Sequence, residues 1–177
     1  ALLADGRRYF RKKPFTLAVR GLSYMRMGKD GGALPPMFIA QPFLMRGFPR
    51  RVLTEDAPQL IAQMQGSKIA LVNAEIRLPL FGPRKLALIP FNFLPTDVNF
   101  FFDTGIAFDD KTSFQKEDPD PLDGVDHVQR RPLYAIGTSF RVNVMGWLIL
   151  EPYYALPLSV NKQDRRWRWG LNIVPGW

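Results

Sequence analysis

The sequence contains no cysteine and a single histidine among its 177 residues. The lack of cysteine excludes disulfide frameworks, thiolate metal sites and cysteine nucleophiles. One histidine cannot build a multi-histidine metal site, although it could serve as a base. No nucleophile stands at motif spacing from His127. We therefore expect no enzyme activity, no metal site and no cofactor.

Long hydrophobic runs are also absent. No stretch approaches the ~20 apolar residues that a membrane-spanning helix requires. The longest candidate, residues 147–150, ends at Glu151. Residues 1–6 lack both an initiator methionine and a basic segment followed by an apolar core, so they do not resemble a signal peptide. We expect this end to be the interior of a longer chain.

The composition is unusual for a soluble domain, because aromatic residues reach 13% while charged residues stay at 23%. Pro and Gly fall in clusters, which is typical of many short elements separated by turns. The net charge of +8 raises the possibility of nucleic-acid binding. Nucleic acid requires a contiguous basic face, and here the basic residues are scattered. We therefore expect no nucleic-acid partner.

Strict alternation of apolar and polar residues predicts β-strands throughout the chain. In residues 69–80 every even position is apolar, whereas the odd positions include Asn73, Glu75 and Arg77. Successive side chains point to opposite faces of a strand, so one face is apolar and the other is polar. We predict seven strands, at residues 15–26, 37–45, 69–80, 97–109, 133–144, 147–158 and 166–177.

The predicted connections alternate in length. Residues 29–32 and 145–146 are typical of tight turns, whereas residues 46–66, 109–132 and 159–166 are long and polar. Short turns at one end and long loops at the other are expected of an outer-membrane barrel. Residues 82–95 break this rule, because they lie on the short-turn side but are apolar and interrupted by three prolines. We interpret them as an irregular excursion at the membrane surface.

A soluble antiparallel sandwich is the simplest alternative explanation of the alternation. Three features favour a transmembrane antiparallel β-barrel instead. The apolar faces run over six positions, which exceeds a typical soluble strand. The opposite faces carry charges near mid-strand, as a wet lumen would, and aromatic residues gather near the strand ends, where membrane interfaces lie. We therefore predict an all-β fold of the barrel type.

Four sequence segments carry a family resemblance. Leu44-Met45-Arg46-Gly47-Phe48 resembles the hydrophobic-Arg-Gly-aromatic motif in the long extracellular loop of the BamA/TamA outer-membrane assembly factors, members of the bacterial surface antigen superfamily. Residues 73–80 resemble the family strand that follows this loop. Phe101-Phe102-Asp103-Thr104-Gly105 resembles the aromatic-Asp-x-Gly strand after it. Residues 169–177 resemble a C-terminal β-signal, whose alternate residues are Trp169, Leu171, Ile173 and Trp177.

The resemblance implies a specific contact inside the barrel. In the family, the long loop folds back into the lumen and its arginine contacts the aromatic-Asp-x-Gly strand. For this chain it implies Arg46 beside Asp103, with Phe101 on the same lumenal face and Glu75 nearby. A guanidinium can make paired, charge-assisted hydrogen bonds to a carboxylate. Gly47 removes a side chain where the loop must pack closely.

The resemblance also implies the domain organisation and the function. Residues 1–177 would be the last seven strands of a single barrel domain of about sixteen strands, in the bacterial outer membrane with a periplasmic C-terminus. Its role would be to insert or translocate proteins. The implied partners are the lipid bilayer, unfolded outer-membrane or secreted proteins, and accessory lipoproteins or other subunits of an envelope complex. Two alternatives stay open: a structural barrel without insertase activity, and a barrel that anchors or exports an N-terminal enzyme.

Overall fold

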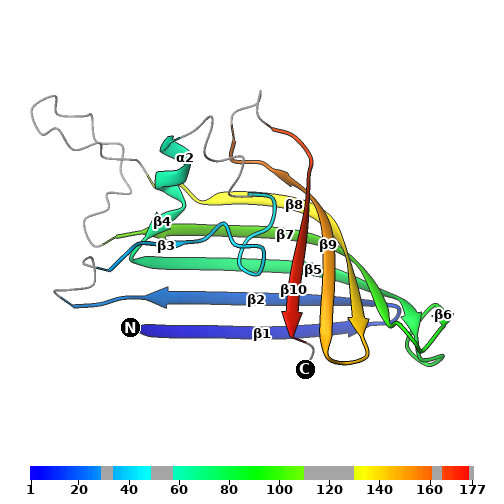
Figure 1. The fold of residues 1–177 in the computed structure, drawn as a ribbon. Helices are drawn as coiled ribbons and strands as arrows, with labels where there is room; N and C mark the ends of the chain where they lie inside the picture. The colour runs from blue at the N-terminus through cyan, green and yellow to red at the C-terminus, as the bar shows by residue number, and fades with distance from the viewer. Residues whose placement is uncertain (29–33, 49–57, 110–129, 161–164, 176–177) are drawn as a thin grey trace, which may run out of the picture.

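The computed structural model describes residues 1–28, 34–48, 58–109, 130–160 and 165–175 as an antiparallel β-sheet with very little helix (Figure 1). Its long strands are β1 (Leu2–Lys12), β2 (Phe15–Met25), β5 (Lys68–Gly82), β7 (Thr96–Phe108), β8 (Leu133–Val144), β9 (Leu148–Pro157) and β10 (Arg168–Pro175). They pair in this order, so each strand lies beside its neighbours in the chain. The predicted all-β class is confirmed at this level.

Three shorter elements accompany the main sheet. β6 (Ile89–Pro90) pairs in parallel with the end of β5. β3 (Met37–Phe38) pairs with β4 (Gln65–Gly66) in a separate two-stranded sheet, and α2 (Pro58–Gln63) precedes β4. None of the helical segments in the described ranges has the length and hydropathy of a membrane span.

The main sheet is strongly curved, and β9 and β10 cross the direction of β1 and β2 in Figure 1. Among the described residues, β1 pairs only with β2 and β10 pairs only with β9, so the sheet has two open edges. Long connections join β2 to β5, β7 to β8 and β9 to β10 at one end of the strands. Short turns join β1 to β2 and β8 to β9 at the other end.

Two details of the strand prediction were wrong. The predicted strand at 37–45 is mostly a loop, because Pro42 favours a turn in which the backbone N–H groups of Leu44 and Met45 both donate to the Gln41 carbonyl at 2.8 Å. The strand β1 was not predicted, because apolar and charged residues occur on both of its faces. The predicted turn at 29–32 lies outside the described residues.

The two faces of the sheet differ in burial. On β7, the alternate residues Asn99, Phe101 and Asp103 are buried on the concave face. Phe100 and Phe102, on the convex face, remain 57% and 39% exposed. The convex face is therefore a broad apolar surface, and the concave face carries the buried polar groups.

The concave face is covered by the loop of residues 34–48 and by α2 (Figure 1). Ile39, Met45 and Phe48 of this loop pack with Met64 and with Leu71 of β5. These apolar contacts lie towards the long-loop end of the strands. They hold the loop against the sheet and so position Arg46, which lies between Met45 and Phe48 in the loop.

Candidate functional site: a buried arginine cluster

Arg46 is directed into the concave face by the turn at residues 41–45. It is 4% exposed, and its contacts are with residues of β5, β7 and β9. Its backbone N–H donates to Asp103 Oδ2 at 3.1 Å. Its side chain therefore begins next to β7 and extends along the polar face of the sheet.

The guanidinium of Arg46 binds the carboxylate of Asp103 at two points. Nε donates to Oδ2 and Nη2 donates to Oδ1, both at 2.8 Å. Such paired, charge-assisted bonds fix direction as well as distance. Asn73 of β5 supports the pair by donating to Asp103 Oδ1 and to the Leu44 carbonyl, both at 2.9 Å. The contact expected between Arg46 and Asp103 is present.

Two further carboxylates meet the same guanidinium. Arg46 Nη1 lies 2.8 Å from Glu75 Oε1 on β5 and 2.8 Å from Glu151 Oε1 on β9. Glu75 also pairs with Arg77 at 2.7 Å and with Arg141 at 3.6 Å. Three guanidinium groups and three carboxylates thus form one linked cluster. Their charges compensate one another, as buried ions require.

Burial alone would lower the pKa of Arg46, but the opposing effect is larger. Hydrogen bonds to Asp103 and the charges of Asp103, Glu75 and Glu151 raise the pKa of Arg46 above its usual value. Arg46 is therefore a cation in the folded protein. The cluster is an ionic clamp between the loop and the sheet.

The Arg46 guanidinium also lies 3.6 Å from the centre of the Phe101 ring. A cation over an aromatic face is attracted by the ring quadrupole, and more strongly when both are dry. Phe101 in turn meets Tyr153 of β9 edge-on, with ring centres 6.4 Å apart. A Cβ at Gly137 would lie 2.5 Å from the Phe101 ring, so β8 needs glycine there to admit the aromatic side chain.

Gly47 is needed for two reasons. Its φ of +90° is a left-handed conformation that favours glycine. A Cβ at this position would also lie 3.1 Å from the Cβ of Ala155 and 3.4 Å from that of Ala135. The backbone of Gly47 forms a hydrogen bond with Tyr153. The loop therefore packs closely against β8 and β9, as the resemblance implies.

The remaining motif residues lie in the apolar part of the interface. Phe48 is 2% exposed and packs in the hydrophobic core rather than in the ion cluster. Gly105 lies two residues beyond Asp103 on the same face, where a Cβ would meet Leu71 Cβ at 3.2 Å. The structure thus brings Arg46, Gly47, Glu75, Phe101 and Asp103 into one site, with Phe48 and Gly105 beside it.

Sequence reasoning missed Glu151 and Tyr153, the two residues through which β9 joins the site. Both occupy the buried face of β9, in alternation with Leu150, Pro152 and Tyr154. Their alternation with outward-facing residues was the sequence signal that could have placed them on the inner face. It did not show that Glu151 would pair with Arg46. Only the strand order shows that β9 lies close enough to reach Arg46.

The predicted C-terminal signal residues lie apart from the cluster. Trp169, Leu171 and Ile173 are on the convex face of β10 and are 75%, 52% and 58% exposed, and Trp177 lies outside the described residues. The opposite face of β10 does reach the site. Asn172 donates to Glu151 Oε2 at 3.3 Å, and the Tyr153 ring covers Gly170.

The cluster borders a cavity of about 420 Å³, whose lining also includes Arg7 and Tyr9 of β1 and Arg20 of β2. In the described part of the chain, no group of three or more His, Asp or Glu side chains is arranged to hold a metal ion. The geometry is that of a structural clamp that joins a loop to five strands. Its chemistry is recognition by ion pairs and hydrogen bonds.

Comparison of the chain with protein-family models, with curated proteins and with solved structures gives no match.

Proposed function

We propose that this chain forms seven long strands of an outer-membrane β-barrel of about sixteen strands that resembles BamA/TamA and inserts or translocates proteins. The observation that carries the proposal is the two-point contact between Arg46 of the loop and Asp103 of β7. It joins the two segments whose sequences resemble the loop and strand motifs of that family. The C-terminal end of the chain would face the periplasm.

The exposed apolar residues of the convex face support a membrane location. A soluble sheet of this size would hide Phe100, Phe102 and Phe140 and expose its charges, whereas here those aromatic residues lie on the exposed convex face. Lipid is the solvent in which such a face is stable. The 12 residues of β8 rise roughly 40 Å along the strand. At a tilt of about 45° this corresponds to roughly 28 Å, close to the hydrocarbon thickness of a bilayer.

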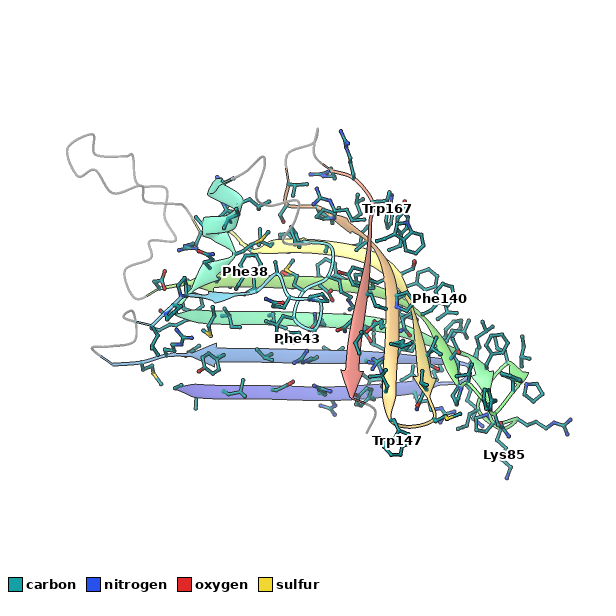
Figure 2. The ribbon with its side chains drawn as sticks, in the orientation of Figure 1. Phe38, Phe43, Lys85, Phe140, Trp147 and Trp167 are labelled. Carbon is teal, nitrogen blue, oxygen red and sulfur yellow. The ribbon has the colours of Figure 1, made fainter. Side chains whose placement is uncertain are left out.

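The positions of the aromatic residues support the same location. Near the long-loop end, the Tyr154 ring stacks on Trp167 with ring centres 4.9 Å apart, and it is tilted against Trp169 at 4.7 Å. Trp147 is 85% exposed at the β8–β9 turn, at the opposite end (Figure 2). Tyrosine and tryptophan favour the two membrane interfaces because their rings are amphipathic. The convex apolar face lies between these two groups.

The mechanism proposed here uses the seam of the complete barrel, where the last strand, β10, would pair weakly with the first strand and leave the edge of that first strand available. An unpaired strand edge presents backbone N–H and C=O groups that can pair with an incoming strand. The clamp around Arg46 is linked to β10 through Glu151 and Asn172. It would therefore hold β10 in place at this seam while a client strand is added to the first strand.

A depletion experiment tests the function. When the protein is depleted, we expect folded forms of other outer-membrane barrels to decrease, as measured by heat-modifiable migration on gels and by surface labelling. Wild-type protein should restore them, and an Arg46→Gln variant that is present at equal level should restore them poorly. Normal assembly of other barrels after complete depletion would refute the insertase role and favour a structural barrel.

A further inference from the structure

The short-turn end of the sheet carries an apolar protrusion, defined here as residues 83–95, which connects β5 to β7. Figure 2 shows it extending beyond the ends of both strands, with Lys85 at its outer tip. Its large hydrophobic side chains are mostly uncovered. Leu86, Leu88, Ile89, Phe91 and Phe93 are between 47% and 62% exposed.

The protrusion has a defined backbone structure. The N–H groups of Leu86 and Ala87 donate to the Pro83 carbonyl at 2.8 Å and 3.0 Å. Leu88 N–H donates to the Pro79 carbonyl at 3.0 Å, and Phe91 N–H donates to the Gly82 carbonyl at 3.1 Å. The protrusion is therefore attached to the end of β5 and presents its apolar side chains in a fixed arrangement.

The aromatic residues of the protrusion continue the apolar surface of the sheet. The Phe81 and Phe91 rings meet edge-on with centres 6.0 Å apart, and Phe91 and Phe93 do so at 6.4 Å. Phe81 belongs to β5, so the apolar surface of the protrusion is continuous with that of the strand. Trp147 extends this end of the molecule at the neighbouring β8–β9 turn.

The charge of the protrusion has one sign. Arg84 and Lys85 are exposed, and residues 80–96 contain no aspartate or glutamate. Basic side chains next to exposed aromatic and aliphatic residues match the boundary of an anionic bilayer, where phosphates lie beside acyl chains. A protein partner with an apolar groove would bury the aromatic residues but would offer no anionic groups to Arg84 and Lys85.

We propose that residues 83–95 insert into the leaflet at the short-turn end, with Phe91 and Phe93 among the acyl chains and Arg84 and Lys85 on the phosphates of anionic phospholipids. This proposal rests on the membrane location proposed above. It adds an in-plane anchor to the transmembrane strands and a preference for lipid charge. The anchor holds the short-turn end of β5 and β7, the strands that carry Glu75 and Asp103.

Single cysteines in the full-length protein provide the test, because the chain has no cysteine of its own. A polarity-sensitive fluorophore is attached to the cysteine of the Asn92→Cys variant, and the protein is placed in vesicles of equimolar phosphatidylcholine and phosphatidylglycerol. In each measurement one of the two lipids is brominated, so that it quenches a fluorophore that it contacts. Lys13→Cys, in the exposed β1–β2 turn at the same end, is the matched control outside the protrusion. Phe140→Cys, on the convex face of β8, reports whether the barrel is in the bilayer.

We expect the label at residue 92 to be quenched by brominated lipid several times more strongly than the label at residue 13. Brominated phosphatidylglycerol should quench it more than brominated phosphatidylcholine. This difference between the two brominated lipids should disappear in the double variant Arg84→Gln/Lys85→Gln, since each basic residue contributes roughly a fivefold preference for the anionic lipid at low salt.

Equal quenching at residues 92 and 13, with strong quenching at residue 140, would overturn the anchor while leaving the barrel in the membrane. Protection of residue 92 from aqueous quenchers without quenching by lipid would also overturn it and would indicate a protein partner. Absence of lipid quenching at residue 140 would instead refute the membrane location itself.

Discussion

Arg46 and Asp103, which are 57 positions apart in the sequence, form a two-point ion pair in which both N–O distances are 2.8 Å. Arg46 belongs to a loop and Asp103 to the middle of β7, so the pair joins the loop to the wall of the sheet. Glu75 approaches the same guanidinium from the neighbouring strand β5, and Glu151 approaches it from β9, which lies beyond β8. The loop is thereby held at the centre of the concave face.

Removal of the Arg46 charge should destabilise the protein strongly. Arg46→Gln leaves three buried carboxylates with only Arg77 and Arg141 to compensate them. Breaking a buried ion cluster in this way costs about 3–5 kcal/mol, so the free energy of unfolding in urea, measured in lipid vesicles, should fall by that amount.

Arg7→Gln is the matched control, because the side chain of Arg7 is 55% exposed and its pair with Asp5 is 3.2 Å long. Such exposed pairs contribute about 0.2–1 kcal/mol. Arg46→Met combined with Asp103→Leu should cost less than the sum of the two single changes, because both partners are removed together. Strict additivity would show that the two residues do not interact.

Substitution of Gly47 should separate steric contact from backbone strain. Gly47→Ala adds a Cβ 3.1 Å from that of Ala155 at a φ of +90°, and we expect a loss of about 2–4 kcal/mol. Gly146→Ala has a similar φ of +78° but open space around the added Cβ, so it should cost only about 1 kcal/mol. Equal losses in the two variants, measured by urea unfolding, would show that the loop does not pack closely against β9.

Gly170 should be essential for the position of Tyr153. A Cβ at residue 170 would lie 2.1 Å from the Tyr153 ring, so Gly170→Ala must displace the ring from Phe101 and Gly47. We expect a stability loss of about 1–3 kcal/mol. Adding Tyr153→Ala to Gly170→Ala should cause little further loss of stability, because the ring is already displaced. A Gly170→Ala variant as stable as wild type would contradict the packing of β10 on Tyr153.

Charge on the convex face should be costly at mid-strand and tolerated at the turn. Phe102→Lys places an ammonium near the middle of β7, where lysine facing lipid costs about 2–4 kcal/mol. Trp147→Lys lies at the β8–β9 turn and should cost about 0–1 kcal/mol from its charge. In water the exposed position of Phe102 would accept lysine readily, so a neutral effect on unfolding would count against the lipid-facing assignment.

The sequence was most informative where one physical pattern dominated. Alternation located β5, β7 and β8 because each has an almost unbroken apolar face. Arg46 and Asp103 were paired through the family resemblance. β1 escaped detection because neither of its faces is consistently apolar: Arg8 shares one with Phe10, and Asp5 shares the other with Tyr9. A strand of this kind is specified by backbone pairing with its neighbour, which composition does not reveal.

The β9 contribution to the site required three-dimensional information. Glu151 reaches Arg46 because β7, β8 and β9 are adjacent and curve around the loop. Asn172 then extends the hydrogen-bond network to β10. Sequence spacing cannot give distances across a curved sheet, so these two residues could be found only once the strand order and register were known.

The assignment of the two faces of the sheet to lipid and to lumen is tested most directly by a cysteine scan of residues 98–104 on β7. Each single-cysteine variant carries the same fluorophore, and quenching by brominated lipid in vesicles is measured at every position. We expect strong quenching at residues 98, 100, 102 and 104, and little at residues 99, 101 and 103, which face the loop. Uniformly weak quenching, with residues 100 and 102 open to aqueous quenchers, would contradict the assignment and indicate a sheet whose apolar face is covered by protein or exposed to water.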